Sequence, residues 1–305
     1  MRAKAFFLAS SLMAGFALSA AAQWVGKVHL LPVVAKNKGQ AGTDWVSDVA
    51  VSNLSGSRVV LQFLFFKENT DNAFLSAPEA WANLAEGGSN LILDVLGSLF
   101  PQVGNSAKGA LAIIASDPSG TDPEPHLAVS SRTYNNADPN RTYGQTVPSV
   151  SSPTALMVWG AGKAVLPGIR QDSRFRTNIG VVNLSSLMSP SPPRLKVKLR
   201  FVGPTGAPIR EVGKEVEALS LRQWSLTELG VTSLLVGRVE ITVDPTDPLY
   251  QPCQIRRDPQ EPGALFVAYY SKVDNATGDA EFSLAQVDWS EYQVCPEPPG
   301  GNPCK

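Results

Sequence analysis

The chain has 305 residues, of which 43% are hydrophobic and 17% are charged, and its formal net charge is −1. This length and hydrophobic content suffice for two domain cores of ordinary size. The near-neutral charge argues against the basic surface that nucleic-acid binding needs, and it gives no electrostatic reason to expect an anionic membrane as a partner.

The first 22 residues have the pattern of a secretory signal peptide. Arg2 and Lys4 supply the positive start, an apolar stretch over 5–17 follows, and the small residues 20–22 precede the expected cleavage before Gln23. We therefore expect export to the periplasm, the cell surface or the extracellular space. No later run approaches the roughly 20 apolar residues of a membrane helix, so no membrane insertion is expected.

Residues 24–150 are predicted to form a first module that is rich in strands. The segment 59–66 is continuously apolar, which favours a strand buried on both faces. A capping-box spacing predicts one or two helical turns over 76–84. Asp94, and Thr227 in the second half of the chain, are each expected to cap a single helical turn.

Residues 151–163 are predicted to link this module to a second one over 164–290. The segment 197–201 alternates apolar and polar residues, which is typical of a strand with one buried face. This alternation places Phe201 in the core of the second module. We expect Phe175 in the same core.

The second half of the chain repeats the first. Trp45–Ser55 aligns with Phe175–Ser185 without a gap, and four of the eleven positions are identical. Further segments match in the same order: Leu31–Val34 with Leu166–Ile169, Leu93–Gly97 with Leu226–Gly230, Gly109–Ile113 with Gly237–Ile241, and Ser131–Asn135 with Ser271–Asn275. Turn residues separate short strands in both halves. We therefore predict an all-β fold of two tandem, duplicated antiparallel β-sandwich domains, each with about seven to nine strands.

Several of these motifs resemble a known family. The motifs are Leu96–Phe100, Ser131–Tyr134, Tyr143–Gln145, Leu166–Asp172 and Phe175–Asn183. They are similar to those of a largely uncharacterised tandem-repeat family of secreted bacterial proteins with immunoglobulin-like β-sandwiches. The resemblance covers nearly all of 28–287, and it implies an immunoglobulin-like fold and export but no reaction and no binding residues. The chain departs from the family in the insertion 245–263 and in its tail.

The tail, 291–305, is rich in proline and glycine and is expected to be irregular. It contains Cys295 and Cys304, and Cys253 lies in the second module. Export permits one disulfide among the three. Cys253–Cys295 is slightly favoured because it closes the longer loop, but Cys295–Cys304 stays open. The spacing lacks the paired ligands and histidines of a zinc site, so no metal and no cofactor is expected.

The sequence shows no recognisable catalytic constellation. His29 and His126 are its only histidines, and neither is accompanied by a Gly-x-Ser-x-Gly elbow. The carboxylates considered as acid–base pairs are Asp44, Asp48, Asp94, Glu228 and Asp274, and none forms a recognisable pair. The Asp-Pro loops 117–124 and 244–248 favour turns over calcium binding, because they lack the ligand spacing of a calcium loop. We therefore expect no enzyme.

Arginines and aromatic residues gather on both sides of the linker. They are Arg132, Tyr134, Arg141, Tyr143, Trp159, Arg170, Arg174 and Arg176. Such residues are typical of contact surfaces, so they are the best candidates for a groove shared by the modules. A plain interface between two domains of one chain explains them as well. Trp81 is a second candidate, either as a platform for a sugar or as a cover for a sheet edge.

These observations favour a secreted or cell-surface protein that binds or assembles without catalysis. An adhesive role, or a part in an extracellular assembly, is one form of this hypothesis. A carbohydrate-binding protein that uses Trp81, Tyr134 or Trp159 is the alternative, and a glycan-active hydrolase is the weakest. The partner is expected to be a protein or a glycan and not a nucleic acid, and the oligomeric state is open.

Overall fold

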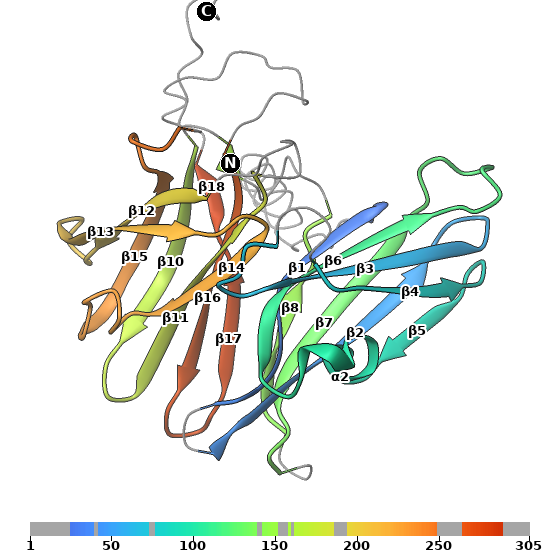
Figure 1. The fold of residues 1–305 in the computed structure, drawn as a ribbon. Helices are drawn as coiled ribbons and strands as arrows, with labels where there is room; N and C mark the ends of the chain where they lie inside the picture. The colour runs from blue at the N-terminus through green and yellow to red at the C-terminus, as the bar shows by residue number, and fades with distance from the viewer. Residues whose placement is uncertain are drawn as a thin grey trace, which may run out of the picture.

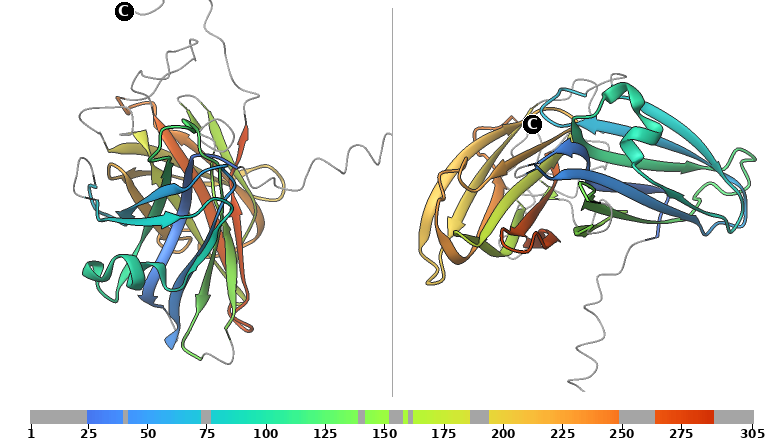
Figure 2. Two further views of the ribbon diagram at one scale, coloured as in Figure 1. Left: turned by 90° about the vertical axis from the view of Figure 1, so that its right-hand side faces the viewer. Right: turned by 90° about the horizontal axis from the view of Figure 1, so that it is seen from below.

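The computed structural model describes residues 25–39, 42–72, 77–138, 142–151, 158–159, 162–185, 194–248 and 264–288. They form two antiparallel β-sandwich modules that lie side by side (Figure 1; the view from below in Figure 2). The prediction of an all-β sandwich fold is confirmed. Within the described ranges, no helix is long and apolar enough to cross a membrane.

The first module has eight described strands. They are β1 (Val28–Lys38), β2 (Asp44–Asn53), β3 (Val59–Lys67), β4 (Glu79–Leu84), β5 (Ser89–Ile92), β6 (Ala107–Ser116), β7 (Leu127–Asn135) and β8 (Gly144–Pro148), with a short helix α2 (Val95–Leu99) and a 3₁₀ turn η2 (Pro101–Val103). One layer has the order β4-β3-β6-β1, and the other has β5-β2-β7-β8. Strand β1 joins them, because it pairs with β6 along most of its length and with β2 at its end.

The second module repeats this order with two additional strands. Its strands are β9 (Val158–Trp159), β10 (Lys163–Gln171), β11 (Phe175–Asn183), β12 (Leu195–Val202), β13 (Pro208–Val216), β14 (Ser220–Ser225), β15 (Leu234–Val243), β16 (Leu265–Asp274), β17 (Ala280–Leu284) and β18 (Gln286–Asp288). One layer has the order β13-β12-β15-β10-β18 and the other β14-β11-β16-β17, and β9 pairs with β16.

The repeated Leu-Pro pair marks the same irregularity in both modules. In β1 the pairing register shifts between Leu31 and Val34, around Pro32. In β10 it shifts between Pro167 and Ile169. Proline cannot donate to the ladder, so a bulge is where a strand tolerates it.

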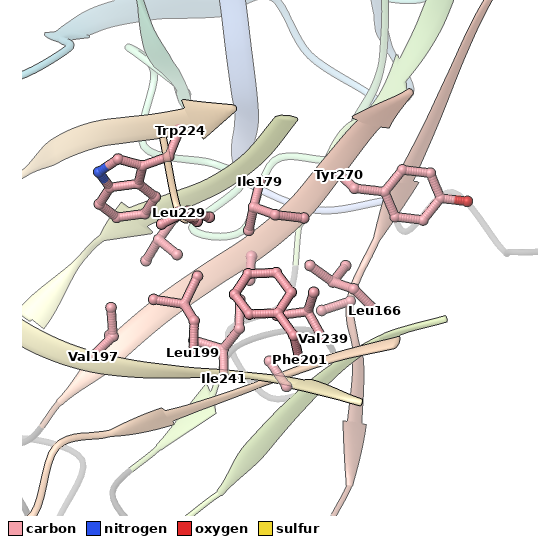
Figure 3. Packing of buried hydrophobic residues seen from close by; sticks show 14 of the residues in the cluster. Leu166, Ile179, Val197, Leu199, Phe201, Trp224, Leu229, Val239, Ile241 and Tyr270 are labelled. Carbon is pink, nitrogen blue, oxygen red and sulfur yellow. The ribbon is translucent and has the colours of Figure 1, made fainter. Parts of the chain in front are cut away.

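The two modules have separate cores. Leu61, Phe63 and Phe65 of β3 are buried in the first core. Leu199 and Phe201 of β12 are fully buried in the second, as their alternation predicted (Figure 3).

The expectation for Phe175 is wrong. This residue is only half-buried and lies outside the second core. Its ring is covered by the guanidinium groups of Arg170 and Arg174, which lie 4.1 and 5.3 Å from the ring centroid. The ring therefore packs under arginine side chains at the start of β11, outside the part of the strand that lines the core.

A third apolar cluster joins the modules. Phe66 of β3 and Ala110 and Ala112 of β6 are buried with Val182, Leu221, Val267 and Tyr269 of the second module. This explains why 59–66 is continuously apolar. One face of β3 lies in its own core, and the other faces the neighbouring module.

The repeated Asn-Leu-Ser motif forms hydrogen bonds of the same kind in both modules, although only one of the two acceptor positions is equivalent. The buried Asn53 amide donates to the carbonyl oxygens of Ser57 (2.7 Å) and Ala85 (2.9 Å). Asn183 donates to those of Val216 (3.3 Å) and Glu217 (3.1 Å). The motif is a buried link between strand ends.

Two local predictions about helical turns are wrong. Residues 79–84 form strand β4, because pairing with β3 outweighs the capping-box pattern. The turn after β14 is capped by Ser225, whose backbone N–H and hydroxyl both donate to the Glu228 carboxylate, and not by Thr227. The expectation for Asp94 is correct, since its carboxylate accepts from the Gly97 N–H at 3.0 Å.

Candidate ligand cleft between the modules

A cleft of about 850 Å³ lies beside the third apolar cluster, with walls from both modules. Amide side chains dominate its lining. They are Asn37, Asn69 and Gln145 of the first module, and Gln171, Asn178, Gln223 and Asn275 of the second. Strands β11, β14 and β16 present these groups because their outward positions alternate with core residues. The strand alternation that buries Ile179 in the core therefore places the neighbouring Asn178 on the cleft side.

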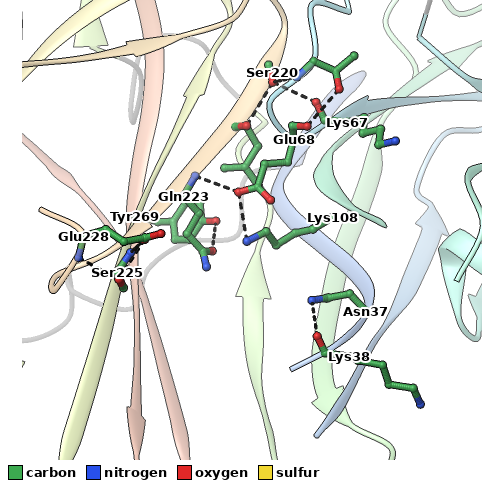
Figure 4. A network of polar contacts seen from close by, with 12 residues as sticks. Asn37, Lys38, Lys67, Glu68, Lys108, Ser220, Gln223, Ser225, Glu228 and Tyr269 are labelled. Carbon is green, nitrogen blue, oxygen red and sulfur yellow. Dashed lines mark hydrogen bonds and ion pairs between the residues drawn. The ribbon is translucent and has the colours of Figure 1, made fainter. Parts of the chain in front are cut away.

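Hydrogen bonds between the modules fix one end of the cleft (Figure 4). The Ser220 hydroxyl donates to the Lys67 carbonyl oxygen at 3.0 Å, and the Asn69 N–H donates to that of Leu221 at 3.0 Å. The Glu68 carboxylate accepts from the Gln223 N–H at 3.1 Å and pairs with Lys108 at 3.2 Å. The walls are thus held at a defined separation.

Three glutamines have their side-chain oxygens already engaged. Gln171 Oε1 accepts from the Thr177 N–H at 3.1 Å, which fixes the orientation of this amide, since a backbone N–H can only donate. Gln145 Oε1 accepts from the Ser271 hydroxyl (3.0 Å), and Gln223 Oε1 from the Tyr269 hydroxyl (2.8 Å).

The amide nitrogens of these glutamines are not used for hydrogen bonds among the described residues. Within the part of the chain that the structure describes, none of the three Nε2 groups has a protein partner. The half-exposed amide of Asn178 has none at either end.

The cleft carries two cations and two carboxylates. Lys108 and Glu68 pair with each other. Arg176 donates to the Asn275 side-chain oxygen. The pKa of Glu228 is lowered, first by its hydrogen bond from the Ser225 N–H, so this carboxyl is ionised at neutral pH. The cleft is therefore polar but close to neutral in total charge.

Aromatic side chains lie at one end of the cleft. The indole of Trp45 is part of the lining, and the Tyr143 ring meets it edge-on with centroids 6.2 Å apart. Tyr143 also packs on Gly278 of the second module, where a Cβ atom would lie 2.6 Å from the ring. Tyr143 thus helps to hold this end of the interface.

Of the predicted groove residues, the structure brings Arg176 into the cleft and Tyr143 next to it. Arg132 stacks on Tyr134 at 4.8 Å on the outer face of β7, away from the lining. Arg174 pairs with Asp274 at 2.9 Å. These pairs are local, and they do not form one shared surface.

The remaining predicted residues lie elsewhere. Trp81 is 56% exposed on the edge strand β4. Trp159 is paired through its backbone to Leu265, and its side chain is outside the description. Arg141, Cys253, Cys295 and Cys304 lie outside the described residues, as does the predicted signal peptide.

The cleft amides were missed by sequence reasoning. They are single polar residues at outward positions of ordinary strands, and nothing local separates them from residues that face solvent. The one sequence feature that pointed to this position is that Asn178 is polar like Asp48, its counterpart in the first repeat.

The Asp-Pro loops are hydrogen-bonded turns. The Asp117 carboxylate accepts from the hydroxyls of Ser119 and Thr121, which are the main cause that holds its pKa well below the usual range. It also accepts from the N–H groups of Ser119, Thr121 and Asp122. Asp244 accepts from the N–H and hydroxyl of Thr246. In the described ranges, no three His, Cys, Asp or Glu side chains group in a way that could hold a metal ion.

No protein-family model matches the chain, and no curated protein matches it. Among solved structures, a Bacteroides uniformis beta-glucuronidase is 10% identical, with a TM-score of 0.17, 84% of this chain covered and 25% of that one. A Streptomyces avermitilis alpha-L-rhamnosidase complexed with L-rhamnose is 12% identical, with a TM-score of 0.23 and coverage of 87% and 29%. This chain spans about a quarter of the length of those chains, and similarity at this level carries no argument about function.

Proposed function

We propose that this protein is an exported binding protein without catalytic activity, and that it holds its ligand in the cleft between its modules. The observation that carries the proposal is a cleft of about 850 Å³ in which the amide donors of Asn178 and of three glutamines lack protein partners among the described residues. Ligand sites typically have volumes of roughly 300–1,000 Å³ and combine concave shape with a few fixed polar groups.

The geometry favours binding over a plain domain interface. The third apolar cluster already joins the modules through side chains such as Phe66 and Tyr269. Gln145 bonds to Ser271 across the interface, but the remaining amide side chains of the cleft form no hydrogen bond between the modules within the described ranges. Leaving buried amides unpaired would cost about 1–3 kcal/mol each if the cleft were closed. A cleft filled by a polar ligand satisfies them.

The carboxylates of the cleft support a role without catalysis. A hydrolytic acid–base pair needs one carboxyl whose pKa is raised. Hydrogen bonds from Ser225 lower the pKa of Glu228 instead. The Glu68 carboxylate is already paired with Lys108 and accepts a hydrogen bond from the Gln223 N–H.

Thermal unfolding in the presence of a ligand panel tests the proposal. The panel contains neutral oligosaccharides, uronate-bearing oligosaccharides and short peptides. A ligand at 100 times its Kd stabilises the folded state by about 2.7 kcal/mol. We expect at least one class to raise the Tm of the wild type and of Trp81→Ala, but not of Asn178→Trp, which places a large ring at the cleft wall.

Arg176→Ala serves as a second cleft variant in case Asn178→Trp folds poorly. A ligand that stabilises both cleft variants as much as the wild type would place the site elsewhere. A panel in which no class raises the Tm would also contradict the proposal.

A further inference from the structure

We propose that the ligand of the cleft is a neutral oligosaccharide, an inference that rests on the proposed function. The first argument is the chemistry of the walls. An amide side chain both donates and accepts hydrogen bonds, as a sugar hydroxyl does. Asn178 offers both ends of its amide, and Gln145, Gln171 and Gln223 each offer a polar end beyond their bond to the protein, which the Thr177 N–H fixes as a donor at Gln171.

An apolar ligand does not fit this surface. It would cover the amides without replacing their hydrogen bonds to water, and each buried unpaired group would weaken binding. A polyhydroxylated ligand restores those bonds. The hydrogen bonds that hold the three glutamine side chains in place lower the cost of ordering the site when the ligand arrives.

The charges of the cleft argue for a neutral ligand. Lys108 and Glu68 neutralise each other at 3.2 Å. Arg176 and Glu228 add one charge of each sign to the lining, so the total is near zero. A sulfated or uronate-rich chain would meet Glu68 and Glu228 without a surplus of cations to compensate. A polyol can donate to the carboxylate and accept from the guanidinium.

The aromatic end of the cleft suits a sugar ring. Trp45 lines the cleft with a large, rigid side chain that has an apolar face, and Tyr143 supports it from the side at 6.2 Å. A pyranose has an apolar face formed by its C–H groups and a polar edge formed by its hydroxyls. It can therefore meet an aromatic wall and an amide wall together.

Isothermal titration of the full chain tests the inference. Fragments of neutral glucans, xylans and mannans are compared with uronate-bearing fragments and with peptides of similar length. We expect a neutral fragment to bind, Asn178→Ala to weaken that binding about tenfold, and Trp45→Ala to weaken it at least as much. Trp81→Ala, an exposed aromatic outside the cleft, should bind like the wild type.

Salt adds a second readout. Because the proposed ligand is uncharged, its Kd should change less than about twofold between 0.05 and 0.5 M NaCl. A charged ligand would lose affinity strongly over the same range.

The outcomes separate the two proposals. Binding of peptides or acidic fragments alone, with loss on Asn178→Ala, would overturn the neutral-saccharide inference and leave the cleft as the binding site. Binding of a neutral fragment that is lost on Trp81→Ala but not on Asn178→Ala would overturn both. Failure of every neutral fragment to bind would overturn the inference.

Discussion

The two modules share a strand order but differ in which outer face is apolar. In β11 and β16 of the second module, the outward cross-strand pairs are Gly180 with Tyr269 and Val182 with Val267. In β2 and β7 of the first module, the pairs at the corresponding register are Ala50 with Ser130 and Ser52 with Ala128. By this register the predicted match of Ser131–Asn135 with Ser271–Asn275 is wrong by one residue. The second module therefore presents an apolar sheet where the first presents a polar one.

The opposite sheets show the reverse difference. In the first module, β3 and β6 place Leu64 opposite Ala112 and Phe66 opposite Ala110, and these residues pack at the interface. In the second module, β12 and β15 place Lys198 opposite Thr242 and Arg200 opposite Glu240. Arg200 and Glu240 lie 3.7 Å apart, so this sheet is covered by ion pairs.

This difference explains why the modules join as they do. Each has one apolar outer face, on opposite sheets, and the two apolar faces meet. The contact is heterologous, because different sheets of the two modules meet. We infer that the modules descend from one ancestral sandwich and that their faces diverged. The shared strand order, the Leu-Pro bulge and the Asn-Leu-Ser hydrogen bonds support this proposal.

The largest expected effect concerns the separate cores. Phe63 of β3 and Phe201 of β12 are fully buried, each in its own module. Replacing either with alanine should lower the free energy of unfolding by about 3–5 kcal/mol, through lost burial and the cavity left behind. Phe175→Ala should cost clearly less, because its ring is only half-buried. Urea unfolding measures all three, and equal losses at Phe175 and Phe201 would contradict the assignment of the core.

The next effect tests the interface between the modules. Tyr269 is fully buried, stacks on Phe282 at 4.8 Å and lies over Gly180. Tyr269→Ser installs the residue that the first module has at this register, and it should cost about 3 kcal/mol. Calorimetry should then resolve separate unfolding of the two modules. The matched control is Ser130→Ala, which should change little, and an unchanged Tm for Tyr269→Ser would show that the apolar cluster does not hold the modules together.

Asn53 and Asn183 test whether the repeated motif plays one role in both modules. Each substitution by alanine leaves buried carbonyl oxygens without their donor, so each should cost about 1–3 kcal/mol. The two losses should be similar, because the hydrogen bonds are the same in kind. Asn83→Ala, at an exposed position of β4, is the control. A large loss of stability for only one of the two alanine variants would show that the motif has different roles in the two modules.

The sandwich could be predicted because the alternation of apolar and polar residues along each strand is visible in a short stretch of sequence. Val197 to Phe201 shows its buried face directly. The error at 79–84 arose because a capping-box pattern is also local, while pairing with β3 comes from residues about 20 positions earlier. The cleft could not be predicted in the same way. Asn178, Gln145 and Gln223 meet only after two modules have folded and docked, and no spacing along the chain records that meeting.

The smallest expected change in stability comes from protonation of His29, a residue of the first module that the second module lacks. His29 is fully buried, and its Nε2 lies 3.0 Å from the Leu127 carbonyl oxygen and 3.1 Å from that of Gly26. Burial is the main cause that lowers its pKa, against hydrogen bonds to these carbonyl groups that raise it. By the Leu-Pro alignment, the second module has Ala164 at this position.

Because the pKa of His29 is lower in the folded state, the unfolded chain binds more protons, and stability rises with pH. This contribution is complete above the unfolded pKa of about 6.5, and it is lost as the pH falls through that value towards the folded pKa. We expect the Tm of the wild type to fall between pH 7.5 and 5.5, and His29→Gln to show a flatter profile over this window. His126→Gln, at an exposed position, should keep the slope of the wild type. Equal slopes for all three proteins would mean that another group carries the pH dependence and that the buried imidazole does not distinguish the first module from the second.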